Sequence, residues 1–232
     1  MRRQTEHALL FLLGAALLRI AADDTFLRYV RPGHRWLLLV AGAVMVVLTA
    51  VAVARDARPP SGTDALGHAH GVVERHVPWL LLVPVLVLAL VAPPALGADA
   101  VARAGVTVPA GEGARLAPLP DGPAALPVSE FVQRAVWEPA SVAGREVVLV
   151  GFAVPRDGGV HLARLSIACC AADARVSRVV LAGAPTGIAP DTWLEVRGAV
   201  QPGPAPAARD LVPTLLVRDL RVVPAPSDPY EY

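Results

Sequence analysis

Residues 36–54 read WLLLVAGAVMVVLTAVAVA, a run of 19 residues without a charged side chain. A helix rises about 1.5 Å per residue, so this run would be about 28 Å long, close to the hydrocarbon thickness of a bilayer. Trp36 begins the run, at the position where an indole ring favours the membrane interface. The run therefore predicts a helix that crosses a membrane.

Two further apolar runs flank this one in the chain. Residues 77–98 read VPWLLLVPVLVLALVAPPALGA and are long enough to span a bilayer, whereas residues 8–22 read ALLFLLGAALLRIAA and are shorter. The shorter run follows two arginines and so also resembles a signal peptide, but Ile20 stands where signal cleavage needs a small residue. We therefore expect residues 1–98 to form a transmembrane domain with three helices, at about 8–22, 36–54 and 77–98.

Arg19 and Pro84 interrupt the first and third of these runs. An arginine within a membrane helix reaches to the interface or faces a partner helix, although it can also simply end the helix. A proline inside a helix kinks it unless a neighbour satisfies the freed carbonyl. Both residues are therefore candidate contact points for a partner subunit.

The composition agrees with a membrane-embedded part and excludes several function classes. Hydrophobic residues make up 54% of the chain and charged residues 18%, against about 45–50% (glycine included) and about 25% in soluble domains. All 21 basic residues are arginine, which excludes a Schiff-base lysine and a P-loop lysine. The net charge is only +1, so no basic field indicates nucleic-acid binding. Arginines are also balanced between the two sides of the expected membrane, so charge does not decide the orientation.

Residues 55–76 connect the second and third runs and read RDARPPSGTDALGHAHGVVERH. His68 and His70, with His76 and two carboxylates nearby, form a pattern that can bind zinc through neutral imidazole nitrogens. The alternative is that these histidines are solvated side chains of an irregular loop, because proline, serine and glycine cluster in the segment. Both interpretations stay open.

The rest of the chain divides into a linker, a second domain and a tail. Residues 99–128 are rich in alanine, glycine and proline, which favours an extended spacer. Residues 129–226 carry regular apolar patterns, and residues 227–232 form a short C-terminal tail. The second domain is therefore expected to fold separately from the apolar N-terminal runs.

The second domain begins with one helical pattern and continues with strand-like runs. The helix covers residues 130–138, with Ser129 as a candidate cap and Pro139 as its stop. Valine and leucine then dominate the runs, as strands prefer, and RDGG at residues 156–159 indicates a hairpin turn. The strand-like runs are 145–154, 160–170, 177–184, 192–200 and 214–223.

Five short strands after one small helix predict a small antiparallel β-barrel, with an OB-like barrel as the first choice. The alternative is another small antiparallel sheet. Phe152 and Trp193 are the only aromatic residues in the strand runs, so no stacking surface for nucleic acid is expected. The predicted fold class is thus an α+β membrane protein with three N-terminal transmembrane helices and an OB-like domain.

Cys169 and Cys170 lie at the end of the second strand-like run, in LSIACCAADA. Adjacent side chains on a regular strand point to opposite faces, so the pair can bind one metal only if the strand ends or bulges there. The residues that follow, up to Asp173, indicate that it ends. Two thiolates, the Asp173 carboxylate and His161 can then form a soft metal or metalloid site, with zinc as one candidate ion. The alternatives are structural cysteines in the core and a redox thiol.

The sequence contains no recognisable catalytic motif. A nucleophile elbow, a zinc-protease helix, a P-loop and a dinucleotide fingerprint are all absent from it. We therefore predict no catalytic residues and expect that the chain is not an enzyme.

The layout as a whole resembles the YcgQ-type family of uncharacterised bacterial membrane proteins, described as subunits of two-component permeases. The resemblance rests on N-terminal helices, a His-bearing loop and the Pro-rich LVAPPALGA. It continues in SEFVQRAVWEPASVAGREVVLVGFAV, LSIACCAADA, DTWLEVRGAV and the terminal DPYEY. The loop here is poorer in histidine than in some relatives, which weakens a metal-buffering role for it.

The resemblance implies a partner, a location and a role. The partner would be a larger polytopic permease of the YcgR type, and the chain would sit in the cell membrane with its C-terminal domain outside the cytoplasm. The expected function is that of an accessory permease subunit whose β-domain binds a soft metal ion or small solute near Cys170 and Asp173. The alternatives are a metal-responsive sensor or buffer without transport, and a membrane-tethered thiol oxidoreductase.

Overall fold

The computed structural model describes residues 2–56, 94–104, 116–200 and 212–232, with the side chains of residues 2–5 left out. Within this part the chain divides into two compact units. The first comprises residues 1–27 and 32–94, and the second comprises residues 28–31 and 95–232. The short segment 28–31 thus belongs with the C-terminal part of the chain, although both its neighbours belong to the first unit.

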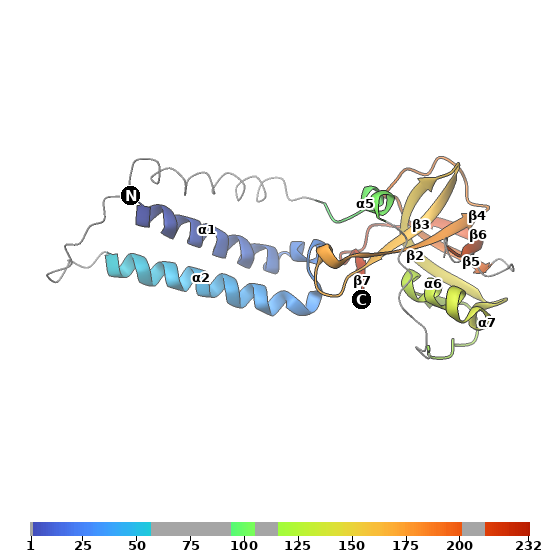
Figure 1. Ribbon diagram of the computed structural model, residues 1–232, viewed down its shortest axis with the longest axis horizontal. Helices are drawn as coiled ribbons and strands as arrows, with labels where there is room; N and C mark the ends of the chain where they lie inside the picture. Colours follow the sequence, from blue (N-terminus) through green and yellow to red (C-terminus); the bar gives the residue numbers. More distant parts are fainter. Residues whose placement is uncertain (1, 57–93, 105–115, 201–211) are drawn as a thin grey trace. The chain divides into compact units, whose positions relative to one another are not determined.

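The first unit contains two long helices, α1 (Arg2–Ala22) and α2 (Arg35–Asp56), seen in Figure 1. The short turns η1 (Thr25–Arg28) and η2 (Pro32–His34) lie between them in the sequence. The two helices approach each other closely at Gly14 and Gly42, where a Cβ atom on either glycine would lie 2.9 Å from the other's carbonyl oxygen. Glycine is needed at this crossing because any side chain would push the helices apart.

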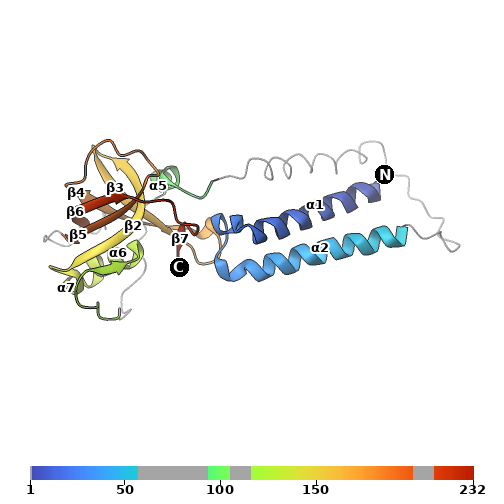
Figure 2. The same cartoon turned by 180° about the vertical axis from the view of Figure 1, so that it is seen from behind.

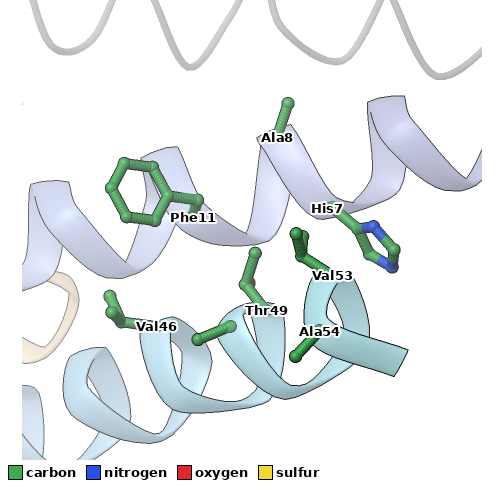
Figure 3. Close-up of a pocket in the computed structure, with 8 residues that line it drawn as sticks. His7, Ala8, Phe11, Val46, Thr49, Val53 and Ala54 are labelled. Atoms are coloured by element: carbon green, nitrogen blue, oxygen red, sulfur yellow. The ribbon is translucent and has the colours of Figure 1, made fainter. Parts of the chain in front are cut away.

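A pocket of about 670 Å³ lies between α1 and α2 towards the start of α1 (Figure 3). Its walls are almost wholly apolar, and His7 and Thr49 are the polar residues that line it. The Thr49 hydroxyl donates a hydrogen bond to the Met45 carbonyl, 2.8 Å away on the preceding turn of α2. The surface of the pocket is therefore mainly hydrocarbon, because the Thr49 hydroxyl donates its hydrogen bond to its own helix.

The prediction of three transmembrane helices is wrong for the part of the chain that the structure describes. One segment there, Pro32–Asp56, is long and apolar enough to cross a membrane. The same length and composition also occur in signal sequences and in core helices of soluble proteins. The helix over the first run, α1, begins with the polar RRQTEH and carries Arg19 in its last turn. Most of the third run, with Pro84, lies outside the described residues, and its end at residues 94–97 is not helical.

The second unit is a sheet with short helices. The helices are α5 (Ala98–Arg103), α6 (Val128–Trp137), α7 (Pro139–Val142) and the one-turn η4 (Ala171–Asp173). The strands are β1 (Ala124–Leu126), β2 (Glu146–Arg156), β3 (Gly159–Ser166), β4 (Arg175–Ala182), β5 (Trp193–Val200), β6 (Thr214–Val222) and β7 (Tyr230–Glu231).

The seven strands form one sheet in the order β1-β2-β5-β6-β4-β3-β7, and β2 also pairs with β3. Figure 2 shows β5, β6 and β4 from behind. The pairs β1–β2, β4–β6 and β3–β7 are parallel, and the other pairs are antiparallel. The prediction of a small antiparallel OB-like barrel is wrong, because the sheet is mixed, has seven strands, and its end strands β1 and β7 do not pair with each other. The pairing of β2 with β3 joins only the five inner strands β2, β5, β6, β4 and β3 in a ring.

The sequence prediction missed the two end strands of the sheet, β1 and β7. The pattern of long valine-rich runs found β2 to β6, and the RDGG turn is confirmed as a two-residue hairpin loop with Asp157 and Gly158 at positive φ. The end strands have only three and two residues and carry no period-2 pattern. They lie in the stretches expected to be a linker and a tail, and only their pairing partners reveal them.

Two apolar clusters hold the second unit together. One contains Phe131 and Val132 of α6 packed against buried side chains of β2 to β6. The other contains Ala98 and Val101 of α5 with further strand residues and Tyr230. Burying a side chain as large as Phe131 contributes about 1.5–3 kcal/mol, so α6 is fixed mainly by this packing.

The C-terminal pentapeptide links segments that are far apart in the sequence. The Glu231 carboxylate accepts hydrogen bonds from the backbone N–H groups of Val128 and Ser129, at 2.7 and 2.9 Å, and so caps α6. Ser129 itself makes no side-chain cap, which corrects the sequence prediction. The same carboxylate lies 3.7 Å from Nε of Arg164, and both side chains are about nine-tenths buried.

Tyr230 extends these links to two more segments. Its side chain is buried, its hydroxyl donates to the Arg28 carbonyl at 2.8 Å, and it accepts from the Leu96 N–H at 3.2 Å. The pairing of β7 with β3 holds Tyr230 and Glu231 in place. The last residues of the chain are therefore part of the folded unit.

Replacing Glu231 by glutamine tests this cap. We expect Glu231→Gln to lower the free energy of unfolding by about 2–3 kcal/mol, because α6 loses a charged cap and Arg164 keeps a buried charge without its partner. The measurement is denaturant unfolding of the full chain in mild detergent, followed by tryptophan fluorescence. Glu195→Gln is the matched control, since Glu195 pairs with Arg221 at the surface and should matter little. Equal unfolding of the two variants would contradict the assignment.

Candidate metal centre

The two cysteines lie in a turn between β3 and β4. β3 ends at Ser166, and the chain passes through Cys169 and Cys170 into η4 before β4 begins. The sequence predicts a strand over residues 160–170 that ends at the cysteine pair, whereas β3 already ends at Ser166 and contains neither cysteine. Because the pair no longer follows a strand, the two side chains are free to approach each other.

Asp173 organises this turn through its carboxylate. Oδ1 accepts from the Ala168 N–H at 2.7 Å, and Oδ2 accepts from the N–H groups of Cys169 and Cys170 at 2.8 and 3.2 Å. Three backbone donors therefore converge on one short side chain. This arrangement satisfies N–H groups that the end of β3 leaves without strand partners.

The two sulfur atoms lie close to each other, and one of them lies close to this carboxylate. The Cys169 and Cys170 Sγ atoms are 3.7 Å apart, and the Cys169 thiol lies 2.8 Å from Asp173 Oδ2. One donor atom from each of the three residues lies within 4.8 Å of the other two. Both cysteines are free thiols, Cys169 is exposed, and Cys170 is half-buried. The three residues can therefore meet one ion that arrives from solvent.

The carboxylate changes the acidity of the site. The hydrogen bond to Asp173, reinforced by the neighbouring Cys170 thiol, raises the pKa of Cys169 to about 11. The same thiol and the backbone N–H groups hold the pKa of Asp173 far below its usual range. At neutral pH the empty site is therefore a protonated thiol bonded to an ionised carboxylate.

The backbone of the turn is fixed by the segment 28–31. Val30 and Cys170 form an isolated antiparallel bridge. The Arg31 N–H donates to the Cys169 carbonyl at 3.1 Å, and the Ala171 N–H donates to the Tyr29 carbonyl at 2.8 Å. Sequence reasoning missed this contact, because nothing in residues 28–31 indicates a partner about 140 positions away. The bridge engages the backbone of the turn.

The remaining predicted site residues do not join this cluster. His161 lies near the start of β3, whereas the cysteines follow its end. Burial, together with nearby Arg178 and Arg156, lowers the pKa of His161. Arg19 is an exposed residue of α1, with its Nε 4.0 Å from Asp23. His68, His70, His76 and Pro84 lie outside the described residues.

Residues 130–232 match the family described as the DUF1980 C-terminal domain. This is an uncharacterised family, and the matched stretch contains the strands β2 to β7 and the Cys169–Asp173 turn. No curated protein and no solved structure matches the chain. The match therefore relates residues 130–232 to an uncharacterised domain and assigns them no activity.

Alkylation rates test the bond between Cys169 and Asp173. We expect Asp173→Asn in a Cys170→Ala background to raise the alkylation rate at pH 8 about tenfold. The thiolate fraction rises about 100-fold when the pKa returns to its ordinary range, and the lower nucleophilicity of the less basic thiolate offsets about tenfold of this. Iodoacetamide kinetics from pH 7 to 11 measure the effect. The two variants should react alike in urea, and equal rates in the folded state would contradict the assignment.

Proposed function

We propose that the chain is a membrane-associated binding subunit whose sheet unit captures a thiophilic metal ion, with zinc as the reference ion. The observation that carries this proposal is the pair of free sulfur atoms 3.7 Å apart on an exposed turn. Cys169 and Cys170 bind the ion, and Asp173 positions them. Soft sulfur donors favour zinc and similar ions over calcium or magnesium.

Binding requires that the thiols lose their protons, because the thiolate is the metal ligand. Cys169 therefore gives up the proton that it shares with Asp173 when the ion binds, and the nearby carboxylate charge offsets the positive charge of the ion. Because the pKa of Cys169 is raised to about 11, protons compete strongly at neutral pH. The site should consequently bind weakly in acid and more tightly as the pH rises.

The alternative function of a thiol oxidoreductase has less support. Catalytic cysteines have lowered pKa values, whereas Asp173 raises the pKa of Cys169. A disulfide would need the two sulfurs to approach to about 2.05 Å, and adjacent cysteines reach this only in a strained ring. The same geometry suits a metal ion, which keeps the sulfurs apart.

Membrane association and a permease partner complete the proposal. The segment Pro32–Asp56 supports attachment to a lipid bilayer. The resemblance to YcgQ-type subunits supports a larger YcgR-type permease as the partner and a sheet unit outside the cytoplasm. The subunit would then present its ion near the permeation path, whereas a sensor or buffer would act without that partner.

Zinc binding to the full chain tests the capture site. We expect titration calorimetry in mild detergent at pH 7.5 to give one zinc per chain, lost in Cys169→Ser/Cys170→Ser because serine is a poor zinc ligand. His161→Gln is the matched control and should bind as the parent does. The affinity should fall about 10- to 100-fold from pH 7.5 to 6.5, since up to two protons compete. Unchanged binding in the double-serine variant would contradict the site.

Co-purification tests the partner. When the tagged chain is expressed with a YcgR-type permease and purified in mild detergent, we expect both proteins in one peak of a sizing column. The matched control is the double-serine variant, which should still assemble because the cysteines are assigned to ion capture. Recovery of the chain alone, with normal transport by the permease in its absence, would contradict the subunit role and favour a sensor or buffer.

A further inference from the structure

We infer that the cysteine pair holds its ion at a bent, tetrahedral-type angle with two protein sulfurs and leaves the other coordination positions open for a donor or acceptor molecule. This inference rests on the proposed function and specifies its ion class and its manner of exchange. It makes the turn a transfer site for a zinc-like ion and distinguishes it from a closed structural zinc site.

The sulfur separation sets the angle at the ion. Zinc–thiolate bonds are about 2.3 Å long, so two sulfurs 3.7 Å apart subtend about 107° at a shared ion. This is close to the tetrahedral angle that zinc adopts in proteins. An ion that prefers two sulfurs in line would need them about 4.6 Å apart at the same bond length. The turn as it stands therefore suits a tetrahedral ion.

The other donors near the pair are already occupied by the backbone. Asp173 Oδ2 accepts from two backbone N–H groups in addition to the Cys169 thiol, and Oδ1 accepts from a third. Using this carboxylate as a full ligand would break hydrogen bonds that hold the turn. Within the described ranges, the metal-ligating side chains that gather here are Cys169, Cys170 and Asp173. Two sulfurs are thus the ligands that the turn supplies without rearrangement.

Closed zinc sites have four protein ligands, whereas sites that exchange ligands keep positions open. Here Cys169 is exposed and Cys170 is half-buried, so solvent can reach an ion that the pair holds. An incoming thiol or carboxylate can therefore bind the ion before the protein releases it. This stepwise exchange is what a subunit that delivers an ion requires.

X-ray absorption of the zinc-loaded full chain in mild detergent tests the inference. We expect about two sulfur scatterers near 2.3 Å and oxygen scatterers near 2.0–2.1 Å. Addition of β-mercaptoethanol should raise the sulfur number to about three while zinc stays on the chain, because the thiol replaces a water ligand.

The outcomes separate this inference from the proposed function. Three or four sulfurs before thiol is added, or imidazole scattering that disappears in His68→Ala/His70→Ala/His76→Ala, would overturn the open site but leave zinc capture intact. A sulfur number that does not respond to β-mercaptoethanol would do the same. No bound zinc, or zinc without sulfur neighbours, would overturn both.

Discussion

The second unit depends on the carboxylate of Glu231, which lies between the start of α6 and the buried guanidinium of Arg164. A helix N-terminus presents unsatisfied N–H groups and a partial positive charge, and a buried arginine adds a full one. The Glu231 carboxylate accepts hydrogen bonds from the N–H groups at the start of α6 and also offsets the charge of Arg164. Because Glu231 belongs to β7, this interaction requires the chain end to pair with β3.

The same chain end connects the fold with the candidate site. Tyr230 bonds to Arg28 through its hydroxyl, and the Arg31 guanidinium lies 5.2 Å from the ring centre of Tyr232. Residues 29–31 then bond to the backbone on both sides of Cys170. The turn that carries the thiols is thus held through a series of contacts that begins at the C-terminus. Backbone support of this kind holds the turn from which the Cys169 and Cys170 side chains project.

Asp173 has opposing effects at the site. It orders the turn by accepting from three backbone N–H groups, and it keeps the Cys169 thiol protonated. A protonated thiol resists alkylation and oxidation, which protects an exposed cysteine. The same proton must leave before an ion can bind. Under the proposed function, this arrangement favours reversible capture of an ion over permanent retention.

The sequence by itself determined the features that depend on neighbours along the chain. The valine-rich runs located β2 to β6, RDGG located the hairpin, and Pro139 marked the end of α6, because these patterns act within a few residues. The small residues after the cysteine pair indicated that a strand ends there, although β3 ends earlier, at Ser166. The lengths of the apolar runs located α2 but predicted too large a membrane region. Run length and composition do not distinguish a helix that spans a membrane from α1, which begins with charged residues.

Only the tertiary structure decided the features that need a distant partner. The parallel pairs of β1 and β7, the Glu231 cap on α6 and the bridge from Val30 to Cys170 each join segments about 20 to 140 residues apart. Strands of two or three residues have no pattern of their own, and a cap supplied from another segment leaves no signal beside the helix. The distance between the two sulfurs also depends on the fold, because it is set by hydrogen bonds to Asp173 and segment 28–31 and not by the cysteine pair alone.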